Sequence, residues 1–264
     1  MKSVLCLGLT PTLQRTLVFD RLEMDEVNRA RQVVESAGGK ALNAARALVA
    51  LGTPTQVAGF NGGDTGRRVT AYLSAYGVDA RTLTTTKAPT RICTTLIDRA
   101  GGTVTELVEE APAPGVAALR RFMRDTLRRT AEAAMLVICG TLPPYADDTF
   151  YVPFVRAATE AGVPVVIDSH RQALVNVLAE RPLLAKLNVR ELETTLGEQL
   201  ASEQRVVRGM REMLARGARN VFVTQGGKAA YLVTPRDAWR FTPPEIKQRV
   251  NPIGSGDSAT AGIA

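Results

Sequence analysis

Short runs of aliphatic residues alternate along the chain with longer stretches in which apolar residues recur every three or four positions. The first pattern is typical of buried strands, and the second of helices with one buried face. Strands and helices that alternate in this way predict an α/β fold, with a mostly parallel sheet between two helical layers and ligands at the carboxyl ends of the strands. The expected strands are residues 4–9, 56–60, 135–139, 163–168, 183–187, 220–224 and 229–233, and the expected helices are residues 40–51, 65–76, 114–131, 147–161 and 202–216.

Two segments, residues 10–35 and 88–109, do not follow this alternation. In the second of them, residues 91–98 and 103–108 alternate in the manner of strands, and Ala100-Gly101-Gly102 forms the expected hairpin turn between them. We expect both segments to build a small β-layer attached to the main sheet. No linker, repeat or low-complexity stretch interrupts the sequence, which predicts a single domain over all 264 residues.

The composition is that of an ordinary water-soluble domain, with 45% hydrophobic and 22% charged residues. No apolar run reaches the roughly 18 residues that cross a bilayer, and the start of the chain lacks a signal-peptide pattern. A cytoplasmic protein without a membrane partner is therefore expected. Three widely spaced cysteines and the single histidine, His170, argue against a disulfide framework and against a histidine-rich metal cluster.

The chain carries a net charge of +7. A basic protein of this kind can bind nucleic acid, but the basic residues are scattered and only 5% of the residues are aromatic, so stacking platforms for bases are few. The densest arginine cluster falls within residues 114–131 and is expected on the outer face of that helix. No nucleic-acid partner is expected, whereas a phosphate-bearing substrate is compatible with the charge.

Three motifs stand where the elements predict ligand contacts. Gly38 and Gly39 precede the helix that begins at Lys40, so the backbone can approach a ligand, and Lys40 and Asn43 share its first turn. Gly254-Ser255-Gly256 before a further helix makes a nest of N–H groups for phosphoryl oxygens, and Asp257 at its start is a candidate base. The ordinary alternatives are a strand-to-helix turn for the first motif and an N-cap role for Asp257. The helix N-terminus would keep the pKa of Asp257 low unless burial opposes it.

Asn188 and Glu191 form the third motif, directly after an expected strand. Three residues apart on a helix, they share a face and could hold hydrated Mg²⁺ and triphosphate oxygens. Taken alone, the pair is equally typical of a polar helix start.

In this order and at these separations the motifs resemble the two signatures of the ribokinase-like carbohydrate kinases, also called the phosphofructokinase-B family. The second signature covers residues 251–264, and the segments 9–16, 62–66 and 102–106 resemble the branch of 1-phosphofructokinase and tagatose-6-phosphate kinase. The first signature covers Gly38, Gly39, Asn43, Gly52 and Gly62.

The resemblance implies a three-layer α/β sandwich with a small β lid and transfer of the γ-phosphoryl group of ATP, with Mg²⁺, to a hydroxyl of a phosphorylated ketohexose of the fructose 1-phosphate or tagatose 6-phosphate type. It gives Asp257 the role of the base, with an anion hole from Gly254, Ser255 and Gly256. It implies a magnesium and triphosphate site, with Mg²⁺ held through water, at Asn188 and Glu191, and a nucleotide loop at Thr224, Gly226 and Gly227. The acceptor sugar would contact Gln14, Gly38, Gly39, Lys40, Asn43 and Arg91.

Two departures lie on the sugar side. Gln14 and Cys93 stand where the branch usually has Asp and Asn, which changes the donors and acceptors offered to a sugar. The phosphoryl-transfer residues are all present, so we expect a kinase whose sugar is left open. The alternatives are a kinase of an unphosphorylated sugar or a nucleoside, and a non-catalytic sugar-phosphate sensor on the same fold.

The resemblance carries two further expectations. Members of the family are often dimers that share the β lid, so a homodimer through this layer is expected. They also continue for a few dozen residues beyond the position of Ala264, so the C-terminal part of the family fold and part of the adenine pocket are expected to lie outside this chain.

Overall fold

The main sheet has eight strands in the order β14-β13-β12-β11-β10-β9-β1-β4. The computed structural model describes residues 2–246 and 253–264. From β4 to β12 the strands run parallel, and β13 and β14 join antiparallel at one edge. The carboxyl ends of the parallel strands therefore meet along one edge of the sheet. The strands are β1 (Val4–Leu7), β4 (Thr55–Ala58), β9 (Met135–Cys139), β10 (Val165–Asp168), β11 (Leu184–Asn188), β12 (Val221–Thr224), β13 (Ala230–Val233) and β14 (Ala238–Phe241).

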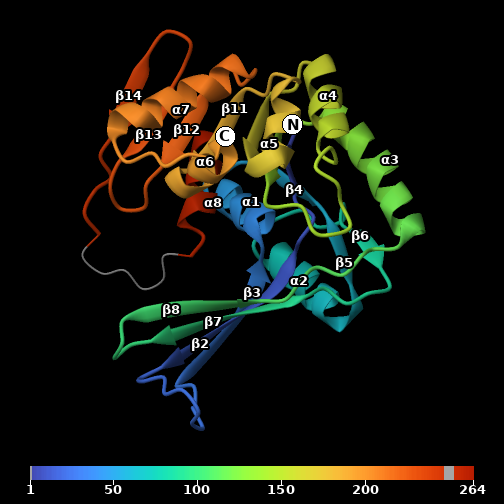
Figure 1. Ribbon diagram of the computed structural model, residues 1–264. Helices are drawn as coiled ribbons and strands as arrows, with labels where there is room; N and C mark the ends of the chain where they lie inside the picture. Colours follow the sequence, from blue (N-terminus) through green and yellow to red (C-terminus); the bar gives the residue numbers. More distant parts are fainter. Residues whose placement is uncertain (1, 247–252) are drawn as a thin grey trace.

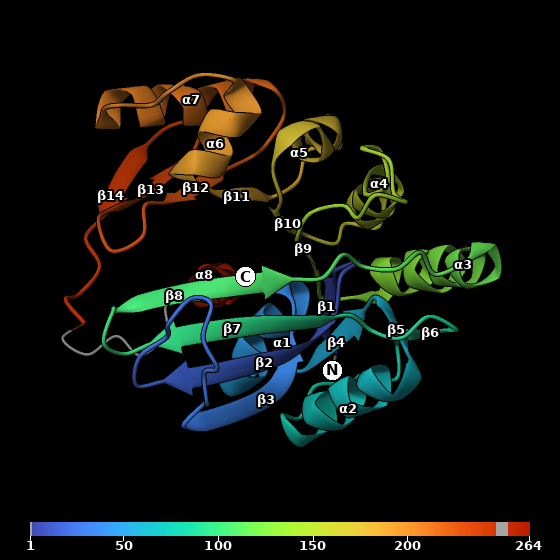
Figure 2. The same cartoon turned by 60° about the horizontal axis from the view of Figure 1, so that its bottom comes forward.

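Helices cover both faces of this sheet, as Figure 2 shows with α4 to α7 on one side and α1 and α8 on the other. Successive side chains of each parallel strand point to opposite faces and are apolar on both, which makes two hydrophobic cores. In β1, Leu5 and Leu7 join the core under α3 to α7, whereas Val4 and Cys6 join the core under α1 and α2. The helices are α1 (Lys40–Ala50), α2 (Gly63–Ala75), α3 (Val116–Glu132), α4 (Val152–Glu160), α5 (Arg171–Leu178), α6 (Val189–Leu196), α7 (Glu203–Ala215) and α8 (Ser255–Ile263).

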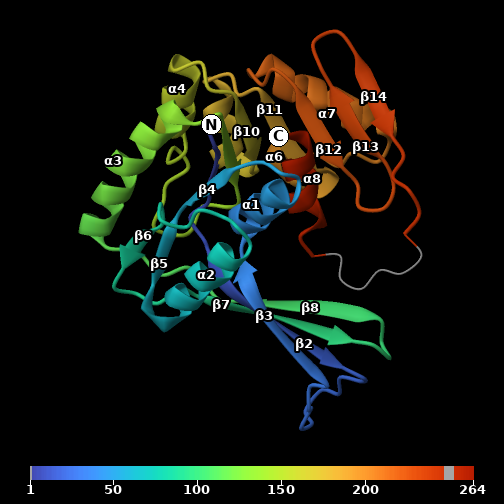
Figure 3. The same cartoon turned by 180° about the vertical axis from the view of Figure 1, so that it is seen from behind.

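A second sheet of four strands, in the order β3-β2-β7-β8, projects from the main body (Figures 1 and 3). It is formed by β2 (Thr12–Phe19), β3 (Gln32–Gly38), β7 (Ile92–Asp98) and β8 (Thr103–Val108). A short pair of strands, β5 (Phe60–Gly62) and β6 (Thr84–Thr86), lies beside α2 and α3. The expected β-layer is thus a separate sheet, and its edge strand β3 leads directly into α1.

The α/β architecture with a mostly parallel sheet is confirmed, and most expected elements lie within a few residues of their predicted bounds. The expected helix 147–161 begins only at Val152, because the Asp147 carboxylate accepts the Thr149 N–H at 2.8 Å and closes a turn ahead of it. The expected strand 56–60 is two strands, of which β4 pairs with β1 and β5 with β6. Helix α5 was not expected, since eight residues give too short a pattern.

No helix in residues 2–246 or 253–264 combines the length and the apolar character that crossing a membrane requires. The expected arginine-rich face is present on α3, where Arg120, Arg121, Arg124 and Arg128 are exposed and Phe122 is fully buried.

We predict that Gly62→Ala destabilises the fold by about 1–3 kcal/mol, the usual range for forcing extra volume into a packed site. A Cβ at this position would press on the carbonyl oxygens of Thr86 and Ala88, which the backbone of the β5–β6 pair holds in place. The free energy of unfolding, from denaturant titration, is the measurement. Gly262→Ala is the matched control, because no atom lies within 4 Å of its Cβ position on α8. Equal stability of the two variants would contradict the prediction.

Candidate active site

The carboxyl edge of the main sheet gathers polar side chains from three neighbouring strands. Asp168 ends β10, Asn188 ends β11 and Thr224 ends β12, and the sheet register pairs Asn188 with Thr224. Helices α1 and α8 pack against each other, and both begin beside this edge (Figure 3). Elements far apart in sequence therefore converge where the fold predicts a ligand.

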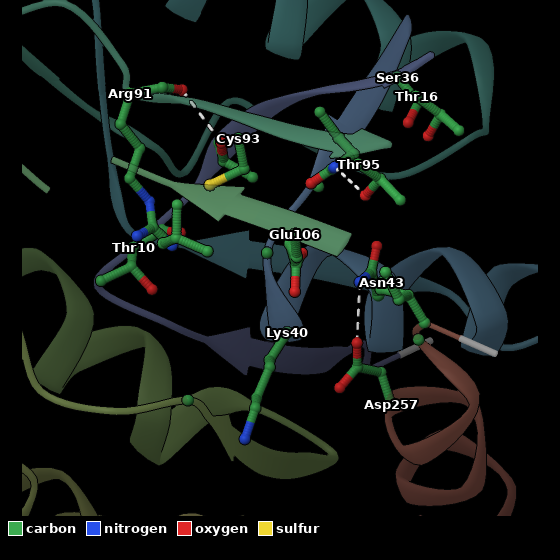
Figure 4. Close-up of a pocket in the computed structure, with 18 of the residues that line it drawn as sticks. Thr10, Thr16, Ser36, Lys40, Asn43, Arg91, Cys93, Thr95, Glu106 and Asp257 are labelled. Atoms are coloured by element: carbon green, nitrogen blue, oxygen red, sulfur yellow. Dashed lines mark hydrogen bonds between the residues drawn. The ribbon is translucent and has the colours of Figure 1, made fainter. Parts of the chain in front are cut away.

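A cavity of about 360 Å³ lies between the second sheet and the start of α1 (Figure 4). The second sheet contributes hydroxyl, amide and carboxylate groups, and α1 and α8 contribute Lys40, Asn43 and Asp257. A cavity with this many convergent polar groups suits a small polyhydroxylated molecule. The lining includes Thr10, Thr12, Gln14, Thr16, Ser36, Gly38, Gly39, Arg46, Arg91, Cys93, Thr95, Glu106, Gly140, Thr141 and Gly254.

Asp257 is the acidic group at the base of this cavity. The Asn43 side-chain amide donates a hydrogen bond to Asp257 Oδ2 at 2.8 Å, which Figure 4 shows as a dashed line. Burial raises the pKa of Asp257 to about 6, and the nearby Asp168 charge adds to this rise against the opposing effects of Asn43, Lys40 and Lys186. The pKa is thus raised although Asp257 lies in the first turn of α8, and a carboxyl with this pKa is ionised at neutral pH and basic enough to accept a proton.

Helix α8 begins with a glycine rather than with a side-chain cap. Gly254 is its N-cap with φ +84°, a left-handed conformation that favours glycine, and Asp257 lies in the first turn. The interpretation of Asp257 as the N-cap is therefore wrong. A Cβ on Gly256 would stand 3.2 Å from Lys186 Nζ, so glycine leaves the first turn open beside a buried ammonium group.

A buried charge network connects α8, the strands and α1. Asp168 Oδ2 accepts hydrogen bonds from Lys186 Nζ at 2.8 Å and from Thr260 Oγ1 at 2.6 Å. All three side chains are buried. Lys40 Nζ lies 3.9 Å from Asp168 Oδ1 and 3.2 Å from Glu191 Oε1, so it bridges the two carboxylates. Positive and negative groups alternate from β11 to α6.

Asn188 and Glu191 form a reciprocal cap at the start of α6. Glu191 Oε2 accepts the Asn188 N–H at 2.8 Å, and Asn188 Oδ1 accepts the Glu191 N–H at 2.9 Å. The interpretation of the pair as a polar helix start is thus correct for their mutual contacts. The cap also holds the side-chain oxygens of Asn188 and Glu191 at the carboxyl edge of the sheet. Glu191 Oε1 accepts a hydrogen bond from Lys40 Nζ.

The predicted sugar-side residues Gln14, Gly38, Gly39, Asn43 and Arg91 all line the cavity. Arg91 donates to the carbonyl oxygens of Thr10 and Glu109 at 3.0 and 2.8 Å, which fixes its guanidinium. Its Nε is buried and has no hydrogen-bond partner among the residues that the structure describes.

Gln14 also has a fixed orientation. Its amide nitrogen donates to Thr95 Oγ1 at 2.9 Å, so the amide oxygen is free to accept. Gly38 makes room for this side chain, since a Cβ there would lie 2.8 Å from Gln14 Cβ.

The remaining predicted residues lie outside the cavity. Thr224, at the end of β12, is beside Asn188, and Gly226 and Gly227 are exposed in the turn to β13. Ser255 and Gly256 are in the first turn of α8. Asn251 and Pro252, which open the second signature, lie outside the described residues.

Three residues of the charge network were missed by the sequence analysis: Asp168, Lys186 and Thr260. A signal was present for the first two, because Asp168 ends a run of buried aliphatic residues and Lys186 interrupts another. Buried charges are rare unless they are paired, and the carboxyl ends of parallel strands are where ligands bind. Thr260 carried no signal, because a threonine among small helix residues is common.

Comparison with known proteins agrees with this geometry. Tagatose-6-phosphate kinase of Staphylococcus epidermidis is 29% identical over 264 residues, which cover 99% of this chain and 84% of that protein. The structure of phosphofructokinase-2 from Escherichia coli in complex with fructose-6-phosphate matches with a TM-score of 0.89 at 26% identity, over 99% of this chain and 85% of that one. The tetrameric inhibited form of the same enzyme gives a TM-score of 0.89 over 99% and 86% of the two chains.

The sequence pattern of the pfkB family of carbohydrate kinases matches residues 1–264, the whole of the chain. The match agrees with the ribokinase-like architecture of the solved relatives, and the resemblance drawn from the motifs is correct. The chain belongs to the pfkB family of carbohydrate kinases and is a phosphotransferase.

Proposed function

We propose that this enzyme transfers the γ-phosphoryl group of ATP to a hydroxyl of a phosphorylated ketohexose of the fructose 1-phosphate or tagatose 6-phosphate type. The observation that carries the proposal is the position of Asp257. Its carboxylate lines a cavity of sugar size and stands at the start of a glycine-rich helix on the carboxyl edge of the sheet. A base at the junction between an acceptor cavity and a phosphate-binding helix end is the arrangement that phosphoryl transfer needs.

Asp257 is proposed to take the proton of the acceptor hydroxyl. The hydroxyl oxygen then forms a bond to the γ-phosphorus while the bond from that phosphorus to the bridging oxygen of ADP breaks. The backbone N–H groups of Gly254, Ser255 and Gly256 supply the anion hole for the charge on the transferred group. Asn43 holds the Asp257 carboxylate toward the cavity through the 2.8 Å hydrogen bond.

The acceptor is proposed to lie among Gln14, Gly38, Gly39, Asn43 and Arg91. Arg91 lines the cavity with its guanidinium held by two backbone carbonyls, and an arginine held in this way can donate further hydrogen bonds to phosphate oxygens. Gln14 replaces the aspartate that is usual in this branch, but Glu106 on β8 brings a carboxylate to the same cavity and can accept sugar hydroxyls. Lys40 was expected to contact the acceptor; its stem lines the cavity, but its ammonium is held by Glu191.

The triphosphate is proposed to lie along the carboxyl edge, with Thr224, Gly226 and Gly227 on the nucleotide side. Mg²⁺ fits the oxygen donors of Asn188 and Glu191 through water, because the reciprocal cap holds both side chains at the carboxyl edge of the sheet. Among the described residues, no group of three or more His, Cys, Asp or Glu side chains could hold a metal ion. When bound, Mg²⁺ would neutralise phosphate charge.

A homodimer through the second sheet is part of the proposal. Val33, Val34, Leu107 and Val108 are each about half exposed on strands of this sheet. They lie on the two edge strands, β3 and β8, and neighbouring residues of a strand point to opposite faces, so each face of the sheet exposes two apolar side chains that a second copy can cover. Phosphofructokinase-2 of E. coli, a structural relative, is described as tetrameric in its inhibited form. The proposed location is the cytoplasm.

We predict that Asp257→Asn lowers kcat by about 10²–10⁴-fold, the usual contribution of a positioned base. The fold is retained, and the melting temperature at pH 7.5 does not fall, because the variant removes a buried charge whose desolvation raises its pKa. Gly256→Val also lowers kcat, because its side chain would crowd Lys186 and the N–H groups of the turn. Near-normal turnover of Asp257→Asn would show that another group is the base.

The pH dependence of kcat/KM should report the Asp257 carboxyl. The base acts when ionised, so activity falls as the pH drops through an apparent pKa near 6. Asn43→Leu removes a hydrogen bond that lowers this pKa, so the acidic limb moves to higher pH. The shift is expected even if the variant also lowers the maximum value of kcat/KM. A limb at the same pH in both proteins would contradict the assignment of Asp257.

The substrate class is tested by an ADP-release screen over sugars, sugar phosphates and nucleosides. We predict that phosphorylated ketohexoses exceed their unphosphorylated counterparts by about 30-fold or more in kcat/KM, which is about 2 kcal/mol. Arg91→Ala should remove most of this preference and affect neutral sugars less, because it removes the donors for the phosphate.

The control for this variant is its melting temperature, because Arg91 also bonds the carbonyls of Thr10 and Glu109. A screen in which fructose, ribose or a nucleoside exceeds every sugar phosphate would overturn the substrate class. Binding of sugar phosphates without any ADP release would favour the sensor.

A further inference from the structure

Lys40 and Lys186 both lie at the carboxyl edge of the sheet, and their side chains differ in how firmly they are held. Lys186 on β11 has a side chain that is only 5% exposed and is paired with Asp168, which Thr260 also contacts. Lys40, the first residue of α1, has a side chain that is 36% exposed and is held by carboxylates through its ammonium alone. Lys186 is therefore a fixed charge, whereas Lys40 can move its charge over a short distance.

The ammonium of Lys40 lies on the triphosphate side of the site. Lys40 lines the acceptor cavity, but in Figure 4 its side chain points away from Arg91, Cys93 and Thr95. The nitrogen is 3.2 Å from Glu191 Oε1 and 3.9 Å from Asp168 Oδ1. The charge therefore stands between the cavity and the cap pair of α6, where the transferred group has to pass.

The acceptor cavity has another cation for a phosphate that the substrate already carries. Arg91, directly before β7, lines the cavity, and its guanidinium is held by the carbonyl oxygens of Thr10 and Glu109. A second cation is thus available for a different phosphoryl group. Burial alone would lower the pKa of Lys40, but the carboxylates of Asp168 and Glu191 raise it overall, so the ammonium remains charged.

We propose that Lys40 binds the phosphoryl group while it is being transferred, and not the phosphate that the acceptor already carries. To do so, its ammonium leaves Glu191 and Asp168. This inference rests on the proposed function. In the step, the acceptor oxygen bonds to the γ-phosphorus, the bond to the bridging oxygen of ADP breaks and Asp257 takes the hydroxyl proton. The Lys40 ammonium donates to the equatorial oxygens of the transferred group and neither gains nor loses a proton. In the transition state, negative charge lies on the phosphoryl group between ADP and the acceptor. A cation placed beside that charge lowers the barrier more than it strengthens substrate binding.

The test compares Lys40→Met, which keeps the length of the side chain, with Lys40→Arg, which keeps the charge. Lys87→Met is the matched control, because Lys87 is exposed and does not line the cavity. For each protein, kcat and KM are measured by ADP release, and the Kd of fructose 1-phosphate and of tagatose 6-phosphate is measured by calorimetry without nucleotide. Melting temperatures show that the variants are folded.

We expect Lys40→Met to lower kcat about 10²-fold and to change the Kd of the sugar phosphate less than threefold, with Lys40→Arg at least tenfold more active than Lys40→Met. A Kd raised tenfold or more with kcat unchanged would mean that Lys40 binds the acceptor phosphate, and would overturn the proposal. Unchanged kcat and Kd would mean that Lys40 only forms an ion pair with Glu191, which would also overturn the proposal. If the wild type turns over only an unphosphorylated sugar, the proposed substrate class fails, and the same comparison with that sugar still decides the role of Lys40.

Discussion

The carboxylate of Asp168 is the contact on which the geometry of the site depends. It is fully buried, yet it accepts hydrogen bonds from Lys186 on β11 and from Thr260 on α8, and it lies near Lys40 on α1. The Asp168 carboxylate thereby connects β10, β11, α8 and α1, four elements that lie far apart in the sequence. Removing one partner of such a buried pair leaves an uncompensated charge, which costs about 3–5 kcal/mol, so the elements hold their mutual positions. The start of α8, and with it Asp257, is fixed relative to the sheet in this way.

The fixed network has a more adjustable counterpart at the base of the cavity. Among the described residues, Asp257 accepts a hydrogen bond from Asn43, and burial of its carboxyl raises the pKa. Within the described part of the chain, Lys40 forms ion pairs with Asp168 and Glu191. The buried ion pair of Asp168 and Lys186 thus lies beside two less firmly held groups, Asp257 and Lys40. The second sheet lines the cavity across from them.

Much of this arrangement could be predicted from the sequence, because both signatures lie on local structure that the sequence determines. Gly39 with its positive φ, Asn43 one turn into α1 and the glycine start of α8 follow from short segments. The Asp168–Lys186–Thr260 contacts could not be predicted, because they join residues up to 92 positions apart and depend on the strand register. Nor could the sequence show that Arg91 is bound to two backbone carbonyls, or that burial raises the pKa of Asp257.

The most direct test of the account is a crystal structure of the enzyme with Mg²⁺, ADP, aluminium fluoride and fructose 1-phosphate or tagatose 6-phosphate, because aluminium fluoride imitates the transferred phosphoryl group. The account predicts the acceptor hydroxyl within hydrogen-bond distance of Asp257, and the fluoride between that hydroxyl and ADP, facing the N–H groups of Gly254, Ser255 and Gly256. A sugar bound outside the cavity, or a carboxylate of Asp257 turned away from the acceptor hydroxyl, would contradict it.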